Sequence, residues 1–300
     1  MVPGTGLDVH LARVLLTPFG KKSENILLGF MLVTALFSMF ISNTATTAMM
    51  LTFLTPVFKQ LPEAGKGRIA MALSIPIAAN LGGMGPPIGT PPNTLALKYL
   101  NDPEGLNLGI GLWMMETFTG INTYTVALIP FAVFAMAGIV TKYDLEEINW
   151  SVIWMVAGGF ALGYAMNGSG LAALVVRAIP FGDFSPLLVV ILSGLLCYGL
   201  SNLISHSATA ALLMPILVVV CTAMGDKLTA IGGTSTVLIG VAIASSSAMI
   251  LPISTPPNAL AYATNFIKQK DMIRMGIIVG AISVILGYLV LFAAGSIHII

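Results

Sequence analysis

The sequence predicts an all-α polytopic membrane protein built as an inverted repeat, with two re-entrant helical hairpins and two unwound helices. Hydrophobic residues make up 57% of the 300 residues and charged residues only 8%, against about 25% charged residues in a typical soluble domain. Segment 87–96 recurs as segment 252–261 with eight of ten positions identical. Each copy interrupts an apolar stretch with Pro and Gly, which is typical of helices that are broken inside a membrane.

The repeat extends beyond this segment. Residues 42–48 match residues 205–211 at four of seven positions, and Gly6-Leu7 matches Gly170-Leu171. The three matches come in one order and at nearly one offset, so we infer a duplication. It divides the chain into a first half, residues 1–115, and a second half, residues 116–300.

The first half contains a predicted hairpin at 22–58, whose arms 24–41 and 43–58 meet at Ser42-Asn43-Thr44. A broken helix is predicted at 67–101, with the break at 83–93. The second half is predicted to contain a scaffold-like helix at 121–141, a helix at 150–168, a hairpin at 185–222, a broken helix at 231–267 with its break at 249–257, and a last helix at 271–297. In both breaks we expect Thr-Pro-Pro to end the first half-helix and the following Asn to cap the second.

Basic residues indicate the orientation of the hairpins, because they concentrate on the cytoplasmic side of membrane spans. Lys21 and Lys22 precede the first hairpin, and Lys59, Lys66 and Arg68 follow it. Both ends of that hairpin are therefore expected in the cytoplasm. The second hairpin has a weaker basic bias and is expected to open to the outside, so the two halves have inverted topology.

Two helices expected from the repeat have no counterpart in the first half. One should precede Gly6, which makes this half N-terminally incomplete, and the other should follow Asn93, where the apolar run 109–115 stops at Glu116. We interpret the chain as a shortened transporter with helices removed near 115/116. The alternative is a naturally compact protein with an interfacial segment at 106–118.

The chemistry available at membrane depth is neutral. All twelve carboxylates lie in loops or at the ends of spans, so a carboxylate proton relay is not expected. Hydroxyl, amide and backbone oxygens suit sodium, while half-helix N-termini suit an anion. A net charge of +1 argues against nucleic acid as a partner. An enzyme is not expected either, because a hydrolase using His206 and its neighbouring serines has no orienting carboxylate nearby.

At the tips and breaks the chain resembles the divalent anion/sodium symporter family. Ser42-Asn43-Thr44 matches the family's hairpin tip, and residues 90–93 and 255–258, both Thr-Pro-Pro-Asn, match its two unwound segments. The resemblance implies an ion-transporter-like, elevator-type secondary active transporter of small divalent anions coupled to co-transported sodium ions. Dicarboxylates such as succinate and malate, citrate and sulfate are the candidate substrates. The resemblance also implies a homodimer if the chain is complete. The chain is expected as a multi-pass integral membrane protein in a lipid bilayer, in a bacterial inner or plasma membrane.

The resemblance also implies the binding residues. The anion is expected to contact the two tips and the two breaks: Ser42, Asn43, Thr44, Thr90, Ser205, His206, Ser207, Thr255 and Pro256. The first sodium is expected among Ser38, Ser42, Asn43, Gly82 and Gly83, and the second among Ser201, Ser205 and Ser254.

The second tip departs from the family pattern, because His206 stands where the first tip has Asn43. Neutral imidazole is a poor sodium ligand and a better anion partner or proton site. The second sodium site is therefore in question, and His206 has either a substrate or coupling role or a packed, hydrogen-bonded one. Two alternatives to a sodium symporter stay open: a sodium-independent or proton-coupled anion exchanger, and a non-transporting truncated remnant.

Overall fold

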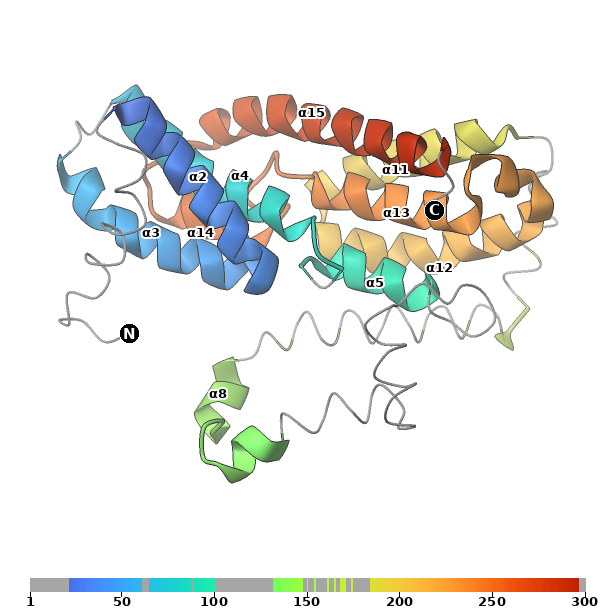
Figure 1. Ribbon diagram of the computed structural model, residues 1–300, viewed down its shortest axis with the longest axis horizontal. Helices are drawn as coiled ribbons and strands as arrows, with labels where there is room; N and C mark the ends of the chain where they lie inside the picture. The colour runs from blue at the N-terminus through green and yellow to red at the C-terminus, as the bar shows by residue number, and fades with distance from the viewer. Residues whose placement is uncertain are drawn as a thin grey trace.

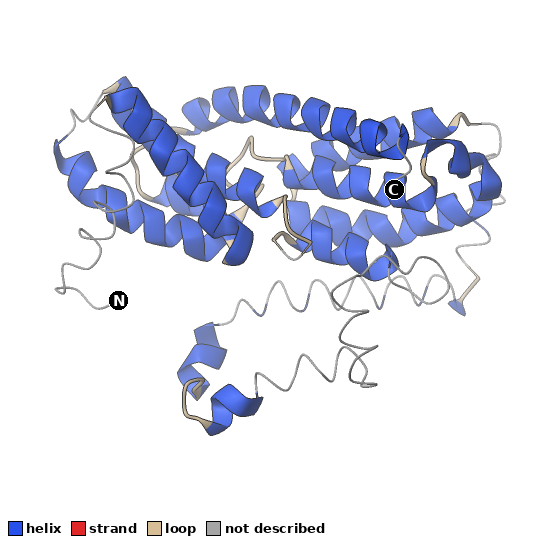
Figure 2. Ribbon diagram, viewed as in Figure 1, coloured by secondary structure: helices blue, strands red, loops and turns tan. Residues whose placement is uncertain are grey.

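The computed structural model describes residues 22–60, 65–87, 89–100, 132–147 and 184–296, with isolated residues between 150 and 174. These residues form helices joined by loops (Figure 2), in agreement with the predicted all-α class. Among them, three helices are long and apolar enough to cross a membrane: Pro186–Leu203, His206–Thr229 and Gln269–Gly295.

A helical hairpin lies at each predicted position. In the first, α2 (Ser23–Phe40) is joined to α3 (Asn43–Gln60) at Ile41 and Ser42; in the second, α11 (Pro186–Leu203) is joined to α12 (His206–Met224) at Ile204 and Ser205. The helix is interrupted at each tip because one residue there has an extended backbone: Ile41 in the first hairpin and Ser205 in the second. The two serine hydroxyls then accept from the N–H three residues ahead, both at 3.2 Å, and so cap the second arm.

Two interrupted helices follow the hairpins. The first consists of α4 (Lys66–Gly83) and α5 (Pro91–Leu100), the second of α13 (Gly233–Ser246) and α14 (Pro256–Ala263). The prediction that Thr-Pro-Pro ends the first half-helix is wrong, since both proline pairs open the second one. Proline is tolerated in a first helical turn, where a backbone N–H has no intrahelical partner. Thr255, not Asn258, caps α14 by accepting from the Asn258 N–H at 3.3 Å.

The remaining described elements are α8 (Lys142–Glu147), the 3-10 helix η3 (Gly225–Ile231) and α15 (Gln269–Ser296). The helix predicted at 121–141 ends early: residues 132–136 are helical, and Gly138, with φ 70°, closes a turn after them. The described positions within the predicted helix 150–168 are helical. The Gly6-Leu7 repeat, the segment 106–118 and the junction near 115/116 lie outside the described residues.

The described helices of the two repeats form two lobes that exchange a half-helix. The first lobe contains α2, α3 and α4 together with α14 of the second repeat, and the second lobe contains α11, α12 and α13 together with α5 of the first repeat (Figure 1). Each broken helix therefore passes from one lobe to the other at its break. Helix α15 runs along both lobes and packs on α13 and α4.

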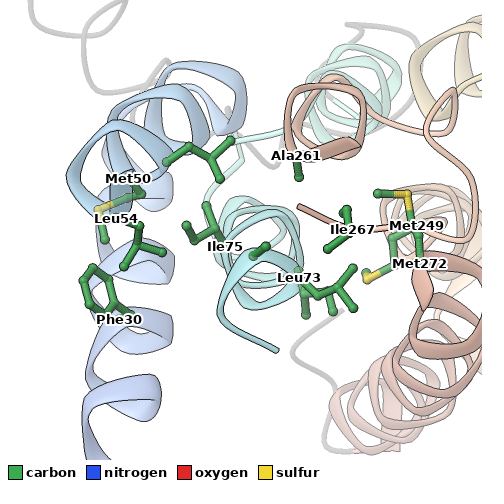
Figure 3. Close-up of a cluster of buried hydrophobic side chains, with 12 residues drawn as sticks. Phe30, Met50, Leu54, Leu73, Ile75, Met249, Ala261, Ile267 and Met272 are labelled. Atoms are coloured by element: carbon green, nitrogen blue, oxygen red, sulfur yellow. The ribbon is translucent and has the colours of Figure 1, made fainter. Parts of the chain in front are cut away.

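Buried side chains show the exchange clearly. In the first lobe, Ala261 of α14 belongs to the same core as Phe30, Met50, Leu54 and Ile75 (Figure 3). The second-lobe core includes three side chains of α5 and others from α11, α12 and α13: Leu95, Ala96, Leu100, Cys197, Met214 and Leu238. Lipid is as apolar as these side chains, so close packing rather than removal from water stabilises such contacts in a bilayer.

Helix α15 approaches the second break closely because it carries glycines on that face. A Cβ at Gly276 would lie 2.4 Å from the Met249 carbonyl oxygen, and one at Gly280 would lie 2.4 Å from the Tyr198 hydroxyl. The opposite face is apolar and exposed, with Ile282 and Leu289 among its side chains. This helix therefore holds the second break from one side while presenting a surface suited to lipid.

Candidate functional site

Four helices begin at the tips and breaks: α3 and α12 after the tips, and α5 and α14 after the breaks. The positive ends of four helix dipoles therefore lie there, although the proline pairs that open α5 and α14 have no N–H to offer. Hydrogen bonds connect the second tip to the second break and each break to the other repeat, as described below. The first tip packs on the end of α4, next to the first break. We call the tips and breaks together the candidate site.

The two breaks are held in shape by the same hydrogen bonds. The Asn93 side-chain amide donates to the carbonyl oxygens of Met84 and Pro86, both at 3.0 Å. The Asn258 amide donates to the carbonyl oxygens of Met249 and Leu251, at 2.9 and 3.1 Å. Donors and acceptors are related by the repeat offset of 165 residues. The role predicted for these asparagines, capping the second half-helix, is thus replaced by fixing the loop that precedes it.

Each break is also bonded to the other repeat. The Thr90 hydroxyl lies 2.9 Å from the hydroxyl of Ser246, at the end of α13. The Asn80 amide, near the end of α4, donates to Thr255 Oγ1 at 3.1 Å and to Asn258 Oδ1 at 3.2 Å. All five side chains are at most 2% exposed. The half-helix exchange brings these groups together.

At the first tip, three oxygens converge. The Ser38 hydroxyl lies 2.7 Å from Asn43 Oδ1 and 2.7 Å from the Ala79 carbonyl oxygen. One hydroxyl proton serves only one of these acceptors at a time, so the cluster is rich in lone pairs. Asn43 also lies against Gly83, where an added Cβ would come within 2.1 Å of Asn43 Oδ1. Of the residues predicted for the first sodium, the structure thus brings together Ser38, Asn43 and Gly83.

Two other residues predicted for the first sodium are engaged elsewhere. A Cβ at Gly82 would lie 2.2 Å from the Ala35 carbonyl oxygen, so this glycine allows α4 to approach α2. The Ser42 hydroxyl accepts from the Ala45 N–H in capping α3. The Ser42 oxygen has a second lone pair that can still accept a bond, but its role as a helix cap was not predicted from the sequence.

The second tip is anchored through its histidine. Both the backbone N–H of His206 and the ring atom Nδ1 lie about 3 Å from the Ser254 carbonyl oxygen, at 3.1 and 3.0 Å. A carbonyl oxygen only accepts, so Nδ1 carries the proton, and the neutral ring presents Nε2 as an acceptor. A neutral His206 therefore accepts hydrogen bonds at Nε2 instead of donating them to an anion. Its packed, hydrogen-bonded role, one of the two predicted alternatives, is present in the structure.

The residues predicted for the second sodium do not form an equally compact cluster. Ser254 Oγ lies 3.2 Å from the Asn202 carbonyl oxygen, and Asn202 Oδ1 accepts from the Ile250 N–H at 2.9 Å. The Ser201 hydroxyl is buried and has no partner of hydrogen-bond geometry in the described part of the chain, although the Cys197 thiol lies near it. The Ser205 hydroxyl caps α12.

Three further buried hydroxyls of the hairpins, on Thr46, Thr47 and Thr209, also lack a hydrogen-bond partner among the described residues. Thr46 and Thr209 are repeat counterparts, four residues after the two tip serines Ser42 and Ser205. Buried polar groups are nearly always paired in native structures. Oxygen atoms next to both tips are therefore available to a ligand.

The remaining predicted anion-binding residues lie at the same helix starts. Thr44 is partly buried in the first turn of α3, Ser207 is buried in the first turn of α12, and Pro256 is the first residue of α14. Sequence reasoning missed Asn80, Asn202 and Ser246 as members of the site. The sequence shows each of them as a polar residue within an apolar segment, but it does not show which residue each one contacts.

The described part of the candidate site is neutral. Among the described residues, the buried polar side chains are Ser, Thr and Asn, with His206 as the titratable exception. Within the same residues no group of three or more His, Cys, Asp or Glu side chains lies together as a metal site would require. The site therefore offers hydroxyl, amide and backbone groups as ligands.

Comparison with known proteins also indicates a transporter. A family described as "Citrate transporter" matches residues 2–232 and again residues 110–299. An inorganic phosphate transporter of Saccharomyces cerevisiae is 25% identical over 89% of this chain and 35% of its own length. A sodium-dependent high-affinity dicarboxylate transporter of Caenorhabditis elegans is 27% identical over 90% of this chain and 68% of its own. The sodium-dependent dicarboxylate transporter SdcS of Staphylococcus aureus is 24% identical over 95% and 72%.

The chain spans only about a third of the length of the yeast phosphate transporter. Its alignments with the nematode and staphylococcal transporters run over 389 and 380 positions, more than the 300 residues of this chain. Within the aligned region, both relatives therefore contain residues that this chain lacks. That finding agrees with an internally shortened chain; the position near 115/116 stays a prediction.

Proposed function

The chain belongs to the citrate-transporter family. On this premise we propose that it is a secondary active transporter of small divalent anions coupled to sodium. It is a multi-pass membrane transporter and not an enzyme. The observation that carries the proposal is a neutral region in which hydrogen bonds join the second tip and the two breaks, with the first tip packed on α4 beside the first break.

An anion is the ligand that this region suits. Four helices start there, and the positive end of each helix dipole carries about half a positive charge. Among the described residues the region has no buried Lys or Arg, so helix ends, hydroxyls and co-bound cations supply the favourable charge. The dicarboxylates named for the nematode and staphylococcal relatives, and the phosphate named for the yeast relative, are both small oxyanions.

The first tip supports sodium as the coupling ion. The Ser38, Asn43 and Ala79 oxygens share one hydroxyl proton, and a hard cation relieves the repulsion between the remaining lone pairs. Sodium prefers such oxygen ligands to imidazole, so the first site fits better than the second. At the second tip, the Ser201 and Thr209 hydroxyls are the oxygens left without partners. We assign the stronger sodium site to the first tip.

Uptake into proteoliposomes tests the proposal. Labelled succinate, malate, citrate, sulfate and phosphate are offered with an inward sodium gradient, with an equal potassium gradient, and with an inward proton gradient. We expect sodium-dependent uptake of at least one divalent anion. Uptake that requires only the proton gradient, or only unlabelled anion loaded inside the liposomes, identifies an anion exchanger. No uptake of any of the five anions indicates a non-transporting remnant.

The inverted topology is part of the same proposal, since an elevator mechanism moves the two hairpins together across the bilayer. It predicts that Lys66 faces the cytoplasm and Lys227 the outside. Single cysteines at these positions, in a background with Cys197 and Cys221 replaced, are labelled in intact cells by an impermeant maleimide. Position 227 should react and position 66 should react only after lysis; labelling of both from one side contradicts the inverted repeat. The proposed homodimer is tested by cross-linking of the same samples.

A further inference from the structure

We infer that Asn80, a residue outside the repeated motifs, is a positioning residue that makes the Thr255 hydroxyl a hydrogen-bond donor to the transported anion. The inference rests on the proposed function, because it concerns the same anion site. It assigns a role to a side chain of the first repeat in shaping the binding segment of the second. The two residues are 175 positions apart in sequence.

Both N–H groups of the Asn80 amide are directed at the start of α14. They reach Thr255 Oγ1 at 3.1 Å and Asn258 Oδ1 at 3.2 Å. Asn80 is 2% exposed, Thr255 2% and Asn258 1%, so water does not compete for these bonds. The arrangement fixes both the capping residue of α14 and the asparagine that holds the second break.

Thr255 Oγ1 accepts a second hydrogen bond, from the backbone N–H of Asn258 at 3.3 Å. A hydroxyl oxygen has two lone pairs and one proton. With both lone pairs engaged by N–H donors, the Thr255 hydroxyl proton is the part left to interact, and no acceptor for it lies among the described residues. An anion at the N-terminus of α14 is the acceptor that this geometry suits.

The arrangement is not a by-product of the duplication. The repeat counterpart of Asn80, at the offset of 165, is Ser245, and its hydroxyl bonds to the Val241 carbonyl oxygen within its own helix at 2.6 Å. At the first break, the Thr90 hydroxyl has a hydroxyl partner, Ser246, with which either group can be the donor. Only Thr255 is thus restricted by two N–H donors, which makes the second break the more selective of the two for an anion.

The test is a double-mutant cycle between Asn80→Ala and Thr255→Val, with succinate and citrate as probes. Thr255→Val removes the hydroxyl and keeps the shape. We expect it to raise the anion KM at least tenfold, since a hydrogen bond to a charged group is worth about one to two powers of ten in affinity. Asn80→Ala should raise KM about tenfold in the wild-type background and have little effect when Thr255 is already Val.

Two further variants separate positioning from folding. Asn80→Asp replaces a donor with an acceptor that captures the Thr255 proton, so it should raise KM more than Asn80→Ala does. Ser74→Ala is the matched control, because Ser74 is buried on the same helix and, among the described residues, its hydroxyl bonds to Met71 of that helix alone, at 2.8 Å. It should leave KM unchanged.

Stabilisation of the detergent-solubilised protein by each anion, read as a shift in melting temperature, provides a second measure of binding. Equal KM increases for Asn80→Ala with and without the Thr255 hydroxyl overturn the inference while leaving the transport function intact. Absence of both uptake and anion stabilisation in the wild-type protein overturns the proposed function, and the inference with it.

Discussion

The two hairpin tips occupy equivalent positions in the repeat but are anchored differently. Asn43 of the first tip lies against the end of α4, where it meets the Ser38 hydroxyl and Gly83. His206 of the second tip bonds instead to the Ser254 carbonyl oxygen within the second break. Within the breaks, the bonds made by Asn93 and Asn258 to the preceding loop are the same in both repeats. The repeats therefore share these asparagine bonds and differ at the tips and at the break threonines.

The residue behind each tip explains the difference. Gly83 leaves no room for a Cβ beside Asn43, while its repeat counterpart is Ala248, which is fully buried. A methyl group at this position excludes the packing seen at the first tip. The second tip accordingly uses the break as its anchor, through a ring that reaches Ser254. One methyl group and one side-chain change thus distinguish the helix-anchored first tip from the break-anchored second tip.

The largest effect is expected from giving the first tip the methyl group of the second. Gly83→Ala places a Cβ about 2.1 Å from Asn43 Oδ1, so Asn43 must leave its position and the Ser38 cluster opens. Uptake should fall by at least about tenfold, as removal of a charge-assisted contact does. Its partner variant, Ala248→Gly, should change uptake less than about threefold. Initial uptake rates at saturating sodium provide the measurement, and equal losses in both variants contradict the comparison.

An intermediate effect is expected from the bonds that the repeats share. Asn258→Ala removes two donors to break carbonyls in a fully buried position, whereas Asn93→Ala does so where the side chain is partly exposed. Leaving buried groups unpaired costs about 1–3 kcal/mol, so Asn258→Ala should lower the melting temperature in detergent more than Asn93→Ala. The reverse order excludes burial as the source of the difference.

The smallest effect is expected from restoring the amide at the second tip. His206→Asn removes the only buried titratable side chain found among the described residues of the site and returns an oxygen that can face sodium. The half-saturating sodium concentration should fall by a few fold, and any change of uptake between about pH 5 and 8 should flatten. Sodium titrations at two pH values, in both proteins, provide the measurement. Four identical curves show that His206 serves packing alone.

The reverse exchange is the control for that variant. Asn43→His puts a larger ring where the amide already packs against Gly83, and the Ser38 hydroxyl loses its Oδ1 acceptor. We expect a loss of sodium-dependent uptake that exceeds any change in His206→Asn. A benign Asn43→His shows that the two tips are interchangeable, which contradicts the asymmetry inferred from the structure.

Much of the described fold could be predicted because its signals are local. Apolar runs set the arms of the hairpins, and Pro, Gly and the tip serines mark where helices stop. The predicted and observed ranges therefore differ by only a few residues at the hairpins, the broken helices and α15, whereas α8 and η3 were not predicted. The roles within the breaks were less accessible. A proline pair fits both the end of one helix and the start of the next, and an asparagine after it fits both a cap and a donor to the loop behind it.

The sequence by itself determined the membrane class, the duplication, the positions of tips and breaks, and the neutral chemistry of the site. These follow from composition and from residues whose backbone preferences act over a single turn. Only the tertiary structure decided that α5 and α14 exchange lobes and that Asn80 bonds to Thr255. It also decided that Asn43 packs against α4 while His206 bonds to the second break. Those contacts join groups separated by up to 175 residues, and their geometry depends on how helices pack, which no local pattern encodes.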